Sequence, residues 1–190
     1  MAFMCNTSKI KSMKLENPKT VMFTGDVKPN GTIVTLKETQ EKTKGREYDH
    51  VHAVEFLTSE TDAVAGKYII VAPEINVEQY RLIDNQISKF VLEADETYAA
   101  YRLQVGDRIE YTDGYFAEGV ADTLVVGDFV EIDGDGKLAK DADGSATTSA
   151  FRVVSILPAQ YPIVMKPGKK SQPIGLMPEA GKKIKLEVVR

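Results

Sequence analysis

A nine-residue phrase that occurs twice constrains the fold of this chain more than any other feature. Residues 103–111 read LQVGDRIEY, and residues 124–132 read LVVGDFVEI, 21 positions later. In each copy a Gly-Asp pair leads into residues that alternate between apolar and polar, the pattern of a strand with one buried face. Turn-forming residues follow each copy, at 113–114 and at 134–136. We therefore predict two strands of an antiparallel β-meander.

The composition is that of a folded domain, and we expect the chain to be made in a cytoplasm. The chain has 190 residues, of which 43% are apolar and 27% are charged, so it can bury a core and is not globally disordered. Cys5 is the single cysteine, which excludes an intramolecular disulfide and a zinc site built mainly from thiolates. No apolar run approaches the roughly 20 residues that a membrane-spanning helix needs, so we expect no contact with a membrane.

Other short segments also have the character of strands. Residues 67–72 form a nearly continuous apolar run that predicts a central strand, and residues 184–189 alternate and predict a final edge strand. The expected fold is thus mainly β, an antiparallel β-barrel or sandwich with one short amphipathic helix and extended terminal arms. The remaining predicted strands lie at 20–23, 32–36, 50–57 and 151–157.

The predicted helix covers residues 76–92. Asn76 is a good N-cap, and Gln79 at the third helical position completes a capping box. Apolar side chains then recur at spacings of three and four, which is the period of an amphipathic helix. They are Tyr80, Ile83, Ile87, Phe90 and Val91.

The two ends of the chain differ from its middle. Residues 1–20 carry a net charge of +3 and residues 160–190 a net charge of +5, although the whole chain has −4, so the body is acidic. Prolines and glycines punctuate the C-terminal part. We predict an extended N-terminal arm at 1–19, a β domain at 20–158, and a C-terminal extension at 159–190 that ends in the edge strand.

Catalytic and metal-binding signatures are poorly supported. His50 and His52 share one face of a strand, but a zinc site needs a further ligand that the sequence does not offer convincingly. The Asp133–Gly136 segment fails the spacing of a calcium loop, and the lysine-containing segment after Pro167 lacks the glycine pattern of a phosphate loop. We expect a protein that is not an enzyme, with no cofactor and no metal. An acidic body also disfavours nucleic-acid binding.

The doubled phrase, the Gly-Asp turns, the strand Phe151–Val154 and the arm-like ends resemble the head-decoration proteins of tailed bacteriophages, also called capsid auxiliary or cement proteins. The resemblance covers roughly residues 100–157 and the general layout. It implies a structural protein of the virion that is made in the host cytoplasm, binds the major capsid protein or another virion protein on the capsid surface, and stabilises contacts between capsomers, often as a homo-oligomer.

Under this resemblance, basic residues near the two ends are the candidates for contact with a partner. The candidate partner-binding residues are Lys9, Lys11 and Lys14 in the arm and Lys166, Lys169 and Lys170 in the C-terminal extension.

Two alternatives to a decoration protein stay open. One is another virion assembly component, such as a tail tube, an adaptor or a head-fibre base. The other is an OB-like protein that binds single-stranded nucleic acid.

Overall fold

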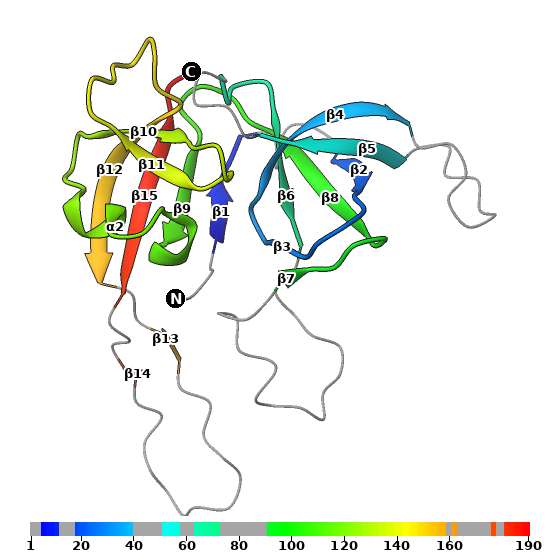
Figure 1. The fold of residues 1–190 in the computed structure, drawn as a ribbon, viewed down its shortest axis with the longest axis horizontal. Coiled ribbons are helices and arrows are strands. Elements are labelled where there is room, and N and C mark those ends of the chain that lie inside the picture. Colours follow the sequence, from blue (N-terminus) through cyan, green and yellow to red (C-terminus); the bar gives the residue numbers. More distant parts are fainter. Residues whose placement is uncertain are drawn as a thin grey trace, which may run out of the picture.

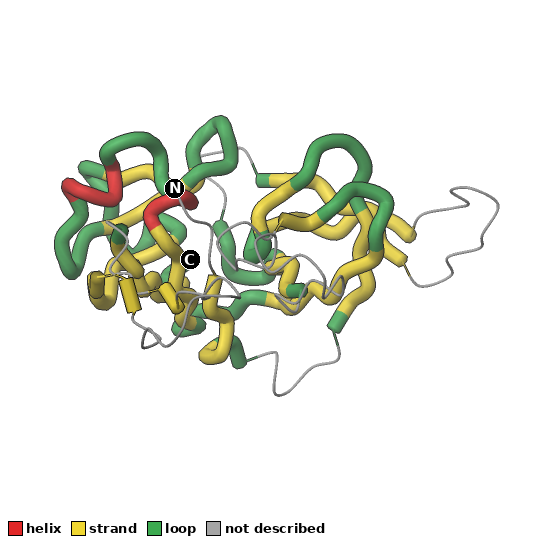
Figure 2. Tube along the Cα trace, turned by 90° about the horizontal axis from the view of Figure 1, so that it is seen from below, coloured by secondary structure: helices red, strands yellow, loops and turns green. Residues whose placement is uncertain are grey.

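The computed structural model describes residues 5–11, 18–39, 51–57, 63–72, 91–158, 161–162, 176–177 and 181–190. These residues build a mainly β protein, which confirms the predicted fold class. Figure 1 shows two β units side by side, a closed barrel and a six-stranded sheet. Figure 2 shows how few helical residues accompany the strands.

Five strands close into the barrel, in the order β2-β5-β4-β6-β8. Strands β2 and β5 pair in parallel, and the other neighbours pair antiparallel. Its interior is apolar, and the ring of Phe23 stacks on Tyr98 and meets the edge of Phe56. The barrel strands are β2 (Lys19–Met22), β4 (Ile33–Thr39), β5 (Val51–Phe56), β6 (Tyr68–Val71) and β8 (Thr97–Arg102).

A short ribbon lies at one end of the barrel (Figure 1). It consists of β3 (Lys28–Pro29) and β7 (Val91–Leu92), which pair antiparallel. Leu92 is fully buried and belongs to the barrel core. The predicted helix at 76–92 falls almost entirely on residues 73–90, which lie outside the described part of the chain; its last two residues are β7.

The six-stranded sheet has the order β1-β9-β15-β12-β10-β11. Two short helical segments, η2 (Asp113–Tyr115) and α2 (Val120–Thr123), connect β9 to β10. Buried side chains of this sheet form one core with Ile33, Leu57 and Ile69 from the barrel side. The strands of the sheet are β1 (Cys5–Lys9), β9 (Arg108–Thr112), β10 (Phe129–Ile132), β11 (Leu138–Asp141), β12 (Phe151–Pro158) and β15 (Lys182–Val188).

The predicted meander of the doubled phrase is wrong. Both copies do form strands, β9 and β10, with the predicted alternation of buried and partly exposed side chains. They are not neighbours, however, because β15 and β12 lie between them. Alternation specifies which face of a strand is buried, whereas the pairing partner is chosen by contacts that are distant in the sequence.

The ends of the chain also differ from the prediction. Residues 5–9 of the predicted arm form β1, which pairs with β9, and Ile10 is buried in the core. The last strand, β15, is not an edge strand, because it pairs with β12 on one side and with β9 on the other. The predicted β domain at 20–158 therefore comprises the barrel and only part of the sheet, which the two ends of the chain complete.

The doubled phrase corresponds to an internal two-fold symmetry of the sheet. Arg152 on β12 pairs with Glu187 on β15, and this pair lies on the pseudo-axis. On one side Glu187 pairs with Arg108 at the start of β9, and on the other side Arg152 pairs with Phe129 at the start of β10. Arg108 and Phe129 occupy the same position in the two copies. A half-turn about the axis thus exchanges β9 with β10 and β15 with β12.

The Gly-Asp turns make the same hydrogen bonds in both halves. Gly106 and Gly127 have φ angles of +85° and +99°, a region that suits glycine. The N–H of Gly106 donates to the carbonyl of Val188 at 2.8 Å, and that of Gly127 donates to Val153 at 2.9 Å. In return, Val188 and Val153 donate their N–H groups to the carbonyls of the two turn aspartates, each at 2.8 Å. The repeated sequence therefore encodes one repeated turn, which fastens each copy to the central pair of strands.

The two turn aspartates differ in what covers them. Asp107 is fully buried, and its carboxylate accepts hydrogen bonds from the N–H groups of Gln104 and Lys11, the latter from the segment after β1. Asp128 accepts from the N–H of Val125 and from the ammonium group of Lys140 at 2.7 Å. The hydrogen bond from Lys140 lowers the pKa of Asp128 below its usual value.

Replacing each turn aspartate by alanine should reveal this difference. Asp107→Ala leaves two N–H groups without their acceptor in a buried site, and we expect it to lower the free energy of unfolding by about 2–4 kcal/mol. Asp128→Ala is the matched control at the more open copy, with an expected loss below about 1 kcal/mol. Urea unfolding measures both, and equal losses would contradict the special role of the covered turn.

Candidate functional site

The barrel and the sheet are joined at the turn Asn30–Gly31. Tyr111, at the buried end of β9, donates its hydroxyl hydrogen to the carbonyl of Gly31 at 2.8 Å, and Tyr115 of η2 donates to the carbonyl of Asn30. The two rings lie 4.6 Å apart between their centroids. The side chain of Asn30 bonds both backbone groups of Ala72, at 3.0 and 3.1 Å. One buried turn therefore anchors both units.

Gly31 has no room for a side chain. Its φ angle is +88°, and a Cβ added there would lie 2.5 Å from Sγ and 2.7 Å from Cβ of Cys5 on β1. In the sequence, Asn30–Gly31 has only the residue types of an ordinary turn. The close approach of β1 was not visible in the sequence, because it depends on the pairing of β1 with β9.

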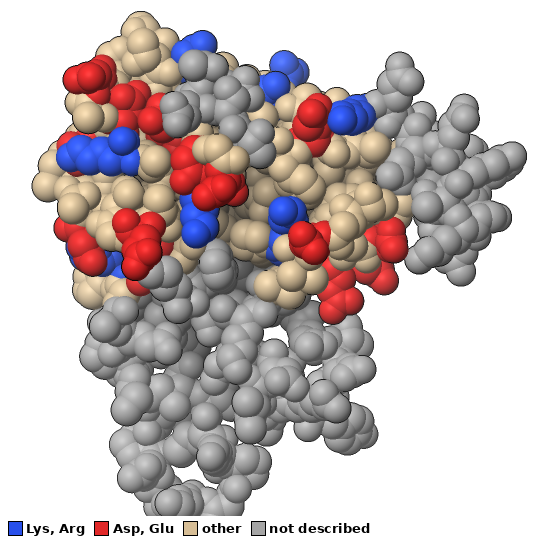
Figure 3. Space-filling model, viewed as in Figure 1, with Lys and Arg blue, Asp and Glu red and all other residues tan. Residues whose placement is uncertain are grey.

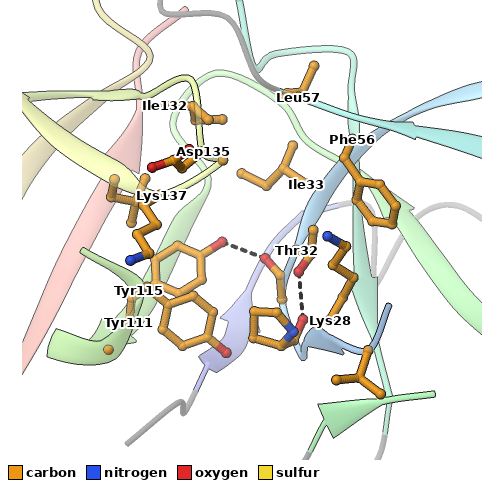
Figure 4. Close-up of a pocket in the computed structure, with 16 residues that line it drawn as sticks. Lys28, Thr32, Ile33, Phe56, Leu57, Tyr111, Tyr115, Ile132, Asp135 and Lys137 are labelled. Atoms are coloured by element: carbon orange, nitrogen blue, oxygen red, sulfur yellow. Dashed lines mark hydrogen bonds between the residues drawn. The ribbon is translucent and has the colours of Figure 1, made fainter. Parts of the chain in front are cut away.

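A cavity of about 270 Å3 opens beside this joint. Figure 4 shows Tyr111 and Tyr115 on its sheet side, and Phe56, Ile33 and Lys28 on its barrel side. The turn between β10 and β11 forms another part of the wall. The described residues that line the cavity are Val27, Lys28, Pro29, Gly31, Thr32, Ile33, Phe56, Leu57, Tyr111, Gly114, Tyr115, Ile132, Asp135, Gly136, Lys137 and Leu138.

Charged side chains occupy opposite sides of this cavity. Lys28 is half-buried, and its ammonium nitrogen lies 4.8 Å from the centroid of the Phe56 ring, a cation–π contact. Asp135 and Lys137 are exposed and belong to the turn after β10. Apolar walls with a few charged groups can bind and orient a molecule. Among the described residues of the lining, none is a histidine, cysteine or serine that could act as a nucleophile beside a base.

The structure does not gather the predicted partner-binding lysines into one described site. The backbone of Lys9 belongs to β1. The ammonium group of Lys11 is exposed but donates to the carbonyl of Val105 at 2.9 Å, so it fastens the chain to the first Gly-Asp turn. The side chain of Lys9 and the other candidates, Lys14, Lys166, Lys169 and Lys170, lie outside the described part of the structure.

A two-stranded ribbon continues the central hairpin of the sheet. Strands β12 and β15 pair as far as Pro158 and Lys182, and beyond them β13 (Tyr161–Pro162) pairs antiparallel with β14 (Leu176–Met177). Figure 1 shows β13 and β14 beyond that end of the sheet. Residues 163–175, which connect them, contain three of the six candidate lysines and no acidic residue.

Basic and acidic side chains are interspersed over the described part of the face in Figure 3. On the sheet, Glu187 pairs with Arg152 at 2.6 Å and with Arg108 at 3.4 Å, and Lys185 pairs with Glu110. The hydrogen bond from Arg152 is the main cause that lowers the pKa of Glu187. On this face, the described residues form no continuous basic stripe of the kind that nucleic-acid interfaces have.

The described ranges contain no group of three or more His, Cys, Asp or Glu side chains that could hold a metal ion. No helix within those ranges is long and apolar enough to cross a membrane.

No protein-family model matches the chain, and neither curated proteins nor solved structures show significant similarity to it.

The crowding at Gly31 predicts a large effect of one added methyl group. Gly31→Ala combines an unfavourable φ angle with a clash against Cys5, and we expect a loss of about 2–4 kcal/mol in the free energy of unfolding. Gly25→Ala is the control, because Gly25 has a φ angle of +102° but no atom within 4 Å of an added Cβ. It should cost only about 1 kcal/mol. Similar losses in the two variants would show that the contact with Cys5 is not tight.

Alkaline pH should weaken the joint through Tyr111. Burial is the main cause that raises the pKa of Tyr111 well above its usual value, whereas a tyrosine in the unfolded chain ionises at about pH 10. Because the folded state holds the proton more tightly, the free energy of unfolding should fall as the pH rises above about 10. Tyr111→Phe removes this effect but costs about 1 kcal/mol at neutral pH through the lost hydrogen bond.

Urea unfolding of both proteins between pH 7 and 11 tests this expectation. The stability deficit of Tyr111→Phe should shrink above pH 10. A deficit that stays constant over the whole range would contradict a buried, protonated Tyr111.

Proposed function

We propose that this protein is a non-enzymatic structural component of a tailed-phage virion, which binds the capsid surface and stabilises contacts between capsomers. The observation that carries the proposal is the ribbon of β13 and β14, which continues the two central strands of the sheet. A force applied to this ribbon would be transmitted to β12 and β15, which are hydrogen-bonded along their length and lie in the middle of the sheet. Such an element suits a protein that holds a neighbour.

The position of the basic residues supports the same proposal. Lys166, Lys169 and Lys170 all belong to the connection between β13 and β14, and the body of the chain is acidic. Positive charges in this connection can contact acidic patches of a partner protein while the acidic body is repelled from nucleic acid. Of the two candidate segments, the ribbon connection is the better supported one, because Lys11 is engaged within its own chain.

Apolar side chains on the turns add a second kind of contact. Val105 and Val126 occupy the same position in the two copies of the doubled phrase and are 58% and 63% exposed, and Val125 is 59% exposed. The core does not use these side chains, and repeated small apolar contacts gain strength when many copies bind one particle. Strands β1 and β11 end the sheet, and the part of β11 beyond Leu138, whose carbonyl already accepts from Ala117, offers backbone groups that could pair with another copy in a homo-oligomer.

Charge reversal on the ribbon tests the proposal. The variant K166E/K169E/K170E should bind empty particles, assembled from the major capsid protein encoded in the same genome, at least about tenfold more weakly. The control K19E/K37E/K67E changes the net charge equally on the barrel and should bind like the wild type. Sedimentation of the particles with labelled protein measures both affinities.

Two outcomes would contradict the proposal. The wild-type protein could fail to bind the particles at any concentration, or the two triple variants could lose the same affinity, which would indicate a charge effect without a specific contact. Salt-dependent binding to single-stranded oligonucleotides would favour the nucleic-acid alternative instead.

A further inference from the structure

The cavity between the barrel and the sheet has no role in the proposed function. Its volume of about 270 Å3 is slightly below the range of about 300–1,000 Å3 for drug-sized ligands, so it suits a small molecule. Ile33, Leu57, Ile132 and Leu138 line it, although each of these residues is at most 8% exposed. Protein interiors are otherwise close-packed, so an apolar hollow of this size with an open mouth is typical of a binding site.

The shape of the walls indicates the apolar part of a ligand. Tyr111 and Tyr115 present their rings on one side, and Phe56 presents its ring on the other. The hydroxyl groups of both tyrosines donate to the carbonyls of Gly31 and Asn30, so the rings are held in place. Aromatic walls that are fixed in this way favour a flat or compact apolar group.

The charges at the mouth indicate the polar part of the ligand. Two ammonium groups, of Lys28 and Lys137, and one carboxylate, of Asp135, line the cavity, which leaves one positive charge in excess. Neither lysine forms an ion pair within the described ranges. Lys137 lies two residues from Asp135, on the sheet side. Lys28 lies on the barrel side and is half-buried, where water screens a charge less.

We propose that this cavity binds an apolar group that carries a carboxylate. The apolar group lies between the two tyrosine rings and Phe56, and the carboxylate pairs with the ammonium group of Lys28. Asp135 repels the same carboxylate and so orients it toward the barrel side. The inference rests on the cavity alone and is independent of the proposed role in a virion.

This ligand chemistry can come from two sources. One is a free aromatic or aliphatic acid, and the other is the C-terminal residue of a peptide, whose side chain and carboxylate have the same arrangement. A suitable pair of probes is 3-phenylpropionate and a tripeptide Gly-Gly-Phe with a free carboxylate, each compared with its neutral counterpart, 3-phenylpropan-1-ol and the tripeptide amide.

Isothermal titration calorimetry with the full chain measures the affinities, and ligand-observed NMR confirms weak binding. At least one of the acids should bind about threefold to tenfold more tightly than its neutral counterpart. Lys28→Gln should remove this preference, and Asp135→Asn should tighten binding of the acid about twofold to threefold by relieving the repulsion. Lys67→Gln on the barrel is the control and should change nothing.

The relative affinities of the two acids identify the source of the ligand, since tighter binding of the tripeptide assigns a protein C-terminus. The proposal is overturned if neither acid binds better than its neutral counterpart, or if Lys28→Gln and Lys67→Gln have the same effect. A further variant, Ile33→Phe, fills the cavity from the barrel side and should abolish binding of both acids. Undiminished binding to a folded Ile33→Phe protein would place the ligand elsewhere.

Discussion

Two hydrogen bonds from tyrosine hydroxyls to one buried turn connect the halves of this molecule. Tyr111 and Tyr115 donate to consecutive carbonyls at Gly31 and Asn30, and the amide of Asn30 continues the contact to Ala72 in the barrel. These groups are buried, so each unpaired partner would carry a desolvation cost of about 1–3 kcal/mol. The joint therefore defines how the barrel meets the sheet, and with it the walls of the cavity.

The sheet has its own organising pair, Arg152 and Glu187, about which the doubled phrase repeats its structure. The Gly-Asp turns hydrogen-bond both copies of the phrase to the central strands, so β12 and β15 hold β9 and β10 in place. These same strands lead into the ribbon of β13 and β14. The central pair of strands and the ribbon that follows it in the chain connect the fold with the function we propose.

Much of the local structure was predictable from the residues. The alternation in both copies of the phrase predicted which side chains are buried, including Ile109, Tyr111, Val130 and Ile132. The apolar run at 67–72 predicted a strand with neighbours on both sides, and β6 does lie between β4 and β8. In contrast, the sequence did not predict that Tyr111 and the turn at Asn30 join the barrel to the sheet. A tyrosine on the buried face of a strand and an Asn-Gly turn are both common features, and neither indicates a contact with the other.

The sequence by itself determined the mainly β class, the buried face of each repeated strand and the turn that precedes it, since these depend on neighbouring residues. The tertiary structure alone decided that β15 and β12 separate the two copies, that β1 closes over Gly31, and that a cavity lies between the units. The reason is that a period of two specifies the face of a strand but not its partner, which is selected by packing between distant segments.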